Sequence, residues 1–155
     1  MPRRIAIAMF AFVLGLVAVD QLGGMALRAV FARTMSGDAG GMVNHALANA
    51  DADVIVFGTS RAAHHVDSAA LSEQLGAYVY NAGVDGQRIF YARMLQALLL
   101  AEGTEARLFV LQVETRGLFK PEPERALVMT PFARRSEDVM DVLARIDPKV
   151  RVKLL

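Results

Sequence analysis

The sequence of 155 residues contains no cysteine, which excludes disulfide scaffolds, cysteine-based zinc sites, iron–sulfur clusters and thiol catalysis. Tryptophan is absent too, and the three histidines are too few for a multi-histidine metal site. Net charge is only +1, because 17 Lys and Arg residues face 16 Asp and Glu residues. The chain therefore lacks the positive field that holds nucleic acid, and we expect no nucleic-acid partner, no metal and no cofactor.

Apolar residues, in contrast, make up 54% of the chain and charged residues 21%, a balance that excludes a disordered protein. A globular chain of this length buries roughly 70% of its unfolded surface, enough for one core. We expect a membrane anchor with a juxtamembrane segment at residues 1–33. A linker with a short helix is expected at residues 34–50, and an α/β domain at residues 51–155.

The beginning of the chain has the pattern of a signal anchor. Arg3 and Arg4 precede residues 5–19, a run without a charged or polar side chain. As a helix this run spans about 22 Å, less than the ~30 Å hydrocarbon core, and Gly23-Gly24 is its predicted end. No clean small-x-small cleavage site follows, so we predict an uncleaved single-pass anchor in the cell membrane, with the α/β domain on the extracytoplasmic side. The alternative is a buried core helix.

Downstream, short apolar runs alternate with helical patterns. The runs predict strands at residues 53–57, 77–80 and 107–113, of which the first and third have the composition of buried strands. Their starts lie 24 and then 30 residues apart, the interval of a βαβ unit. The fold class is therefore α/β, with a parallel sheet covered by helices on both faces.

Helices are expected where capping residues flank a periodic pattern. Asp67 caps residues 68–75, which end at Gly76, and Ser136 caps a helix that runs through residue 146. Between them, residues 87–101 form a helix whose expected buried positions are 90, 94, 97, 98 and 101. Residues 150–154 alternate and are expected to open a fourth strand.

Polar and glycine residues follow each predicted strand at once. In open parallel sheets, ligands bind beyond the carboxyl ends of the strands, so these residues are expected to line one crevice. They are Gly58, Thr59, Ser60 and Arg61 after the first strand, Asn81, Gly83 and Gly86 after the second, and Glu114 and Arg116 after the third. Neither a G-x-G-x-x-G motif nor a Walker A loop is present, so we expect no nucleotide.

Ser60 has two interpretations. Its hydroxyl could point into the crevice as a nucleophile, beside backbone N–H groups that stabilise an oxyanion. It could instead be an ordinary N-cap that accepts hydrogen bonds from the next helix. Arg61 is similarly either a ligand for an anion or a salt-bridged helix residue.

The stretches Phe57–Ala62 (Phe-Gly-Thr-Ser-Arg-Ala) and Asn81–Gly86 (Asn-Ala-Gly-Val-Asp-Gly) resemble the first two blocks of the SGNH (GDSL-type) hydrolase superfamily. They are most similar to its membrane-anchored branch with Gly-Ser-Ser-Arg in the first block. The resemblance covers residues 53–119 and implies a flavodoxin-like three-layer sandwich. It also implies hydrolysis or transfer of O-acyl groups, with an acylated glycan or cell-envelope polymer as partner.

Under this resemblance, Ser60 falls on the nucleophile, and the Ser60 and Gly86 N–H groups fall on two oxyanion donors. Arg116 falls where the family has an oxyanion-binding Asn, which is a departure from its pattern. The family's general base lies in a later Asp-x-x-His block, and no such block follows residue 117. The chain is therefore expected to be the N-terminal portion of a longer protein and inactive by itself.

His64 is the other candidate base, but a base on the same helical turn as Ser60 is rarely in line with a substrate. His64 and His65 are otherwise polar residues of the surface or crevice, and Asp85 is expected to form a turn with Gly86. Two functions remain open: an esterase or acyltransferase in the full-length form, or a non-catalytic binding module of the same fold for an acylated glycan or a membrane partner.

Overall fold

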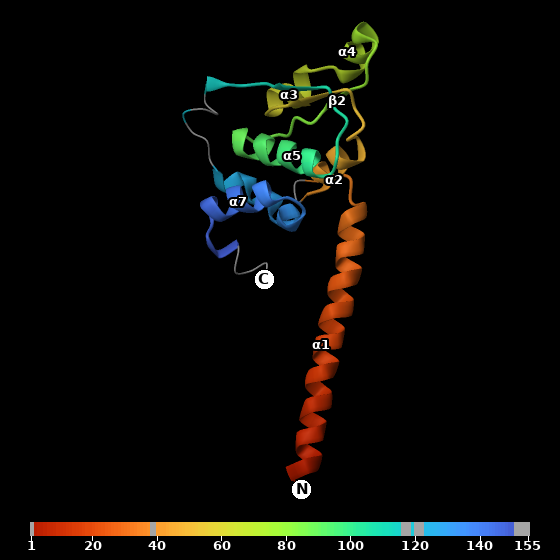
Figure 1. Cartoon of the computed structure of the whole chain (residues 1–155), viewed down its shortest axis with the longest axis vertical. Helices are drawn as coiled ribbons and strands as arrows, with labels where there is room; N and C mark the ends of the chain where they lie inside the picture. The colour runs from red at the N-terminus through yellow and green to blue at the C-terminus, as the bar shows by residue number, and fades with distance from the viewer. Residues whose placement is uncertain (1, 38–39, 116–118, 120–122, 151–155) are drawn as a thin grey trace. The chain divides into compact units, whose positions relative to one another are not determined.

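The structure is a computed structural model that describes residues 2–37, 40–115, 119 and 123–150 (Figure 1). It divides into two compact units, Met1–Thr34 and Met35–Leu155. The boundary falls where the apolar head of the sequence gives way to a turn-rich segment. The two units are described separately below.

The first unit is one helix, α1 (Pro2–Arg33), of 32 residues. With a mean hydropathy of 2.2, it is long and apolar enough to cross a membrane, two criteria that a signal sequence also meets. No part of its apolar window is buried, which gives no support to the buried-core alternative. The predicted end at Gly23-Gly24 is wrong, since the helix continues to Arg33. Each of the two glycines weakens the helix by about 1 kcal/mol, but the residues on both sides favour the helix strongly enough to keep it continuous.

The second unit contains a parallel sheet, as predicted. Its strands are β1 (Val54–Phe57), β2 (Val79–Asn81) and β3 (Leu108–Leu111), in the order β2-β1-β3. In β1, Ile55 is aligned with Tyr80 of β2 and with Phe109 of β3. The apolar, β-branched sequence of β1 suits this central position, where both edges are paired.

The expectation that the third strand is buried is wrong. In the described sheet β3 is an edge strand, and the side chains of Leu108, Val110 and Leu111 are 53%, 40% and 44% exposed. Apolar composition is the same for a central strand and for an edge strand whose faces are partly uncovered. The order of the strands decides whether a strand is central or lies at an edge, and this order depends on contacts between distant segments.

The helices of the second unit are α2 (Gly41–Ala48), α3 (Ser60–His65), α4 (Ser68–Leu75), α5 (Ile89–Ala101), the 3₁₀ helix η1 (Pro123–Arg135) and α7 (Glu137–Ile146). The predicted boundaries of α4 and α7 are confirmed. The Asp67 carboxylate accepts hydrogen bonds from the N–H groups of Ala69 and Ala70, both at 3.0 Å. Ser136 accepts one from the N–H of Val139 at 3.4 Å.

Helix α5 lies between the sheet and α7 (Figure 1). Its buried residues are Tyr91, Ala92, Met94, Leu95, Leu98 and Leu99. The predicted face is right at positions 94 and 98 and wrong at 90, 97 and 101, which are half-buried or exposed. The buried face of α5 is set by the elements that pack against it, η1 and α7, and these could not be identified from the apolar period alone. The predicted fourth strand at residues 150–154 lies outside the described residues except for Val150, which is helical and not extended.

Candidate functional site

The site forms where the carboxyl ends of the parallel strands meet. The backbone ladder continues past the strands, as the N–H of Ala82 donates to Val56 O at 2.8 Å and the N–H of Val84 to Gly58 O at 3.1 Å. On the other side, the N–H of Gln112 donates to Phe57 O at 2.8 Å. The polar segments after all three strands are thereby held at one edge of the sheet.

An open hollow of about 540 Å³ lies at this edge, and we call it the polar hollow. It brings together five residues that the sequence placed in the crevice, Thr59, Ser60, Arg61, Gly86 and Glu114. The other lining residues are Gln87, Arg88 and Thr115. Arg116, the remaining candidate for oxyanion binding, lies outside the described residues.

Ser60 is the first residue of α3 and is exposed. The N-cap of this helix is Thr59, whose hydroxyl accepts a hydrogen bond from the N–H of Arg61 at 3.4 Å. The capping alternative for Ser60 is therefore not the one observed. The Ser60 hydroxyl makes no hydrogen bond within the described part of the chain, and it can rotate toward a ligand in the polar hollow.

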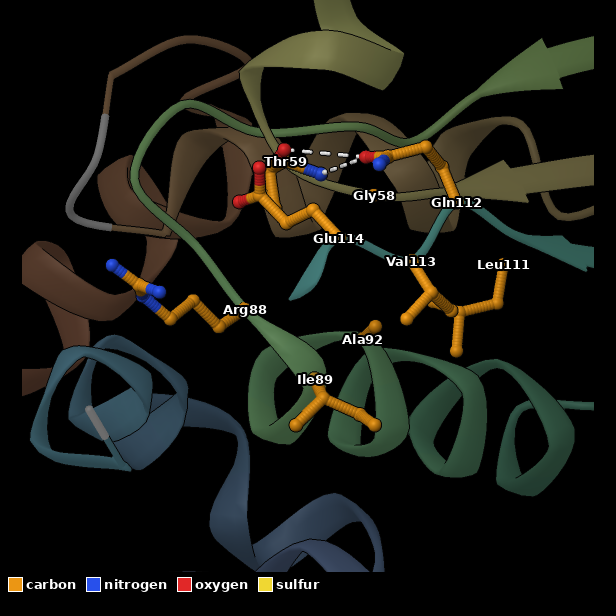
Figure 2. A pocket seen from close by; sticks show the side chains of 9 residues that line it. All are labelled: Gly58, Thr59, Arg88, Ile89, Ala92, Leu111, Gln112, Val113 and Glu114. Atoms are coloured by element: carbon orange, nitrogen blue, oxygen red, sulfur yellow. Dashed lines mark hydrogen bonds between the residues drawn. The ribbon is translucent and has the colours of Figure 1, made fainter. Parts of the chain in front are cut away.

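Thr59 is held by Gln112, a residue that the sequence analysis did not single out. The Gln112 side-chain oxygen accepts hydrogen bonds from the N–H of Thr59 at 3.3 Å and from its hydroxyl at 3.2 Å (Figure 2). The available signal was an amide side chain directly after the apolar run of β3. This pair ties the end of β3 to the turn that presents Ser60.

Asn81 and Gly83 do not line the polar hollow; they hold α3 against β2. The Asn81 amide donates to Ala62 O at 2.8 Å and to Val66 O at 3.0 Å, and its oxygen accepts from the N–H of Gly83 at 3.0 Å. Gly83 lies so close to α3 that an added Cβ would be 2.6 Å from the nitrogen of Ala63. Both residues therefore fix the position of α3, the helix that carries Ser60.

Two of the charged residues at the hollow form an ion pair. Arg61 Nε lies 3.6 Å from Glu114 Oε2, so the salt-bridged alternative for Arg61 is the one observed. The Arg61 side chain is 68% exposed, so this pair contributes little stability in water. With Arg88 also at its wall, the hollow has two guanidinium groups and one carboxylate among its lining residues.

A second, apolar pocket opens next to the polar hollow and shares Thr59, Arg88 and Glu114 with it. Figure 2 shows Leu111 and Val113, at the end of β3, facing Ile89 and Ala92 of α5. Gly58 and Gln112 complete the lining. The apolar pocket has a volume of about 20 Å³, so only a small apolar group could bind there beside a polar group in the hollow.

An imidazole–carboxylate pair lies near the hollow. His64 Nε2 is 3.0 Å from Asp85 Oδ1 and 3.1 Å from Asp85 Oδ2, and both side chains are 64% exposed. Asp85 also belongs to the predicted turn with Gly86, whose φ is +70°. The pair joins α3 to the loop after β2, a contact that no local sequence pattern reveals.

Comparison of the chain with family models, with curated proteins and with solved structures assigns it to no family. No family model matches this chain, and no curated protein or solved structure matches it. Among the residues that the structure describes, no three His, Asp or Glu side chains gather in a group that could hold a metal ion. The functional argument therefore depends on the geometry of the polar hollow.

Proposed function

We propose that the chain carries a membrane-anchored domain of the SGNH hydrolase type, with a flavodoxin-like three-layer fold. In its full-length form it hydrolyses or transfers an O-acyl group on a glycan or envelope polymer. The observation that carries the proposal is the position of Ser60, which is exposed at the carboxyl edge of a parallel sheet in the same hollow as Gly86. A hydroxyl so placed can attack a carbonyl carbon that reaches the hollow.

In this proposal Ser60 is the nucleophile, and the N–H groups of Ser60 and Gly86 stabilise the oxyanion of the tetrahedral intermediate. The first N–H groups of α3 have no intrahelical acceptor, which makes the Ser60 N–H available to a ligand. The left-handed conformation of Gly86 suits a residue without Cβ at the wall of the hollow. Preorganised donors of this kind are each worth about 10²–10³-fold in rate.

Labelling with a fluorophosphonate tests whether Ser60 is a nucleophile. We expect a covalent adduct on the full chain, measured by intact mass and peptide mapping, and at least about a tenfold loss of labelling in Ser60→Ala. Ser68 provides a matched control, since it is also the first residue of a capped helix. Ser68→Ala should keep the adduct, and equal labelling of Ser60→Ala would contradict the proposal.

The second candidate function is a non-catalytic module of the same fold that binds an acylated glycan or a membrane partner. It is favoured by Arg116, which stands at the Asn position of the family pattern. A chain that binds an acetylated glycan but resists the fluorophosphonate at Ser60 would establish this function instead.

Membrane topology is the remaining part of the proposal. We propose that α1 is an uncleaved, single-pass anchor with Arg3 and Arg4 on the cytoplasmic side, which follows the positive-inside rule. Alkaline phosphatase fused after Gly41 should be active, and β-galactosidase fused there should be inactive. The same fusions without residues 1–34 are the control and should show the reverse. Reversed activities in the fusions that keep α1 would refute this orientation.

A further inference from the structure

The pair of His64 and Asp85 connects the two segments that form the proposed oxyanion site. His64 lies on α3, four residues after Ser60, and Asp85 directly precedes Gly86. Because Nε2 contacts both carboxylate oxygens, at 3.0 and 3.1 Å, the carboxylate orients the imidazole ring. A base held by a third group is the arrangement that activates serine nucleophiles on unrelated folds.

Ser60 and His64 lie four residues apart on α3. Residues four apart on a helix share a face, with Cβ atoms about 5–6 Å from each other. Helical side chains generally lean toward the N-terminus of the helix, which is the direction in which Ser60 lies from His64. In the described part of the chain, His64 Nδ1 has no hydrogen-bond partner and neither has the Ser60 hydroxyl. For the two groups to act together, the Ser60 hydroxyl must rotate onto Nδ1 while Nε2 stays on Asp85.

We infer that His64 is the general base for Ser60 and that Asp85 is its positioning residue, an inference that rests on the proposed function. The other two histidines are unsuitable. His45 Nδ1 is engaged with the Tyr80 hydroxyl at 2.7 Å, and His65 has no carboxylate partner among the described residues. This assignment differs from the sequence expectation, which gave His64 a minor place because a base on the same turn as its nucleophile is rarely in line with a substrate and an orienting acid.

In the resulting reaction, every proton and electron pair is accounted for by Ser60, His64, the ester and the attacking water or hydroxyl. The Ser60 hydroxyl gives its proton to His64 Nδ1 while Oγ bonds to the ester carbonyl carbon, and the carbonyl electron pair moves onto the oxygen. The intermediate collapses, the bond from carbon to the alcohol oxygen breaks, and the leaving alkoxide takes the proton from Nδ1. Water, or an acceptor hydroxyl, attacks acyl-Ser60 by the same sequence, which yields a carboxylic acid or a new ester and restores Ser60.

The test is hydrolysis of phenyl acetate by the full chain in detergent micelles, with each variant checked for native circular dichroism. We expect Ser60-dependent turnover, in place of the inactivity expected from the sequence. Ser60→Ala and His64→Ala should each lower kcat by about 10²-fold or more, since a positioned base contributes about 10²–10⁴-fold. Asp85→Asn should lower kcat roughly tenfold with KM unchanged, because it removes only the orienting group.

His65→Ala is the matched control, because His65 neighbours His64 and is exposed. It should keep kcat within about twofold of the unmodified chain. Added imidazole should restore turnover to His64→Ala, measured against the double variant Ser60→Ala/His64→Ala in the same buffer. A merely structural role for His64 would not respond to imidazole.

The outcomes separate the inference from the proposed function. Ser60-dependent turnover that persists in His64→Ala overturns the inference and leaves the proposed function standing, with a base elsewhere. Absence of Ser60-dependent turnover also overturns the inference. In that case the fluorophosphonate adduct decides the proposed function by itself, since it reports the nucleophile without requiring a complete cycle.

Discussion

Replacing Leu98 by alanine is expected to lower the free energy of unfolding of the second unit by about 2–5 kcal/mol. Leu98 is fully buried on α5, which is packed against both η1 and α7. Because η1 and α7 both hold α5 in place, neither can move in to fill the cavity that the shorter side chain leaves. Because a domain of this size is stable by only about 5–15 kcal/mol, the variant should unfold at clearly lower urea concentration.

Leu100 provides the control on the same helix, since its side chain is 57% exposed. Leu100→Ala should change stability by less than about 0.5 kcal/mol. Urea unfolding can be followed by near-ultraviolet circular dichroism of the tyrosines, all three of which lie in the second unit. Equal destabilisation by the two variants would show that α5 is not placed as described.

Gly83→Ala is expected to damage both stability and the site. Its new Cβ would lie 2.6 Å from the nitrogen of Ala63 and 2.8 Å from the Cβ of Ala62, so α3 must move away from β2. Overpacking of this kind costs about 1–3 kcal/mol. Since α3 carries Ser60, the same movement should reduce fluorophosphonate labelling, measured alongside urea unfolding.

Gly76→Ala separates this steric effect from the effect of backbone conformation. Gly76 ends α4 with φ +60° and has no atom within 4 Å of an added Cβ. Its replacement should cost about 1–2 kcal/mol from left-handed strain and leave labelling of Ser60 unchanged. If Gly83→Ala instead keeps full labelling and the stability of the unmodified chain, the close approach of α3 to β2 is incorrect.

Much of the candidate site could be predicted because it depends on strand ends. The switch from apolar to polar residues after Phe57 and Tyr80 marks where two strands stop, and parallel pairing then brings Ser60 and Gly86 to one edge. Only the class of fold is needed for that step. The partners of Thr59 and His64 could not be predicted, because Gln112 and Asp85 come from other segments of the chain.

The sequence alone determined the features that depend on neighbouring residues. The strand β1, the caps of α4 and α7 and the apolar character of α1 all follow from side chains within one or two turns of each other. Tertiary structure alone decided that β3 lies at the edge of the described sheet, which face of α5 is buried and that Asp85 binds His64. The physical reason is that burial and pairing at these positions depend on which elements meet. That choice minimises the free energy of the whole fold, whereas caps and strand propensity are properties of short segments.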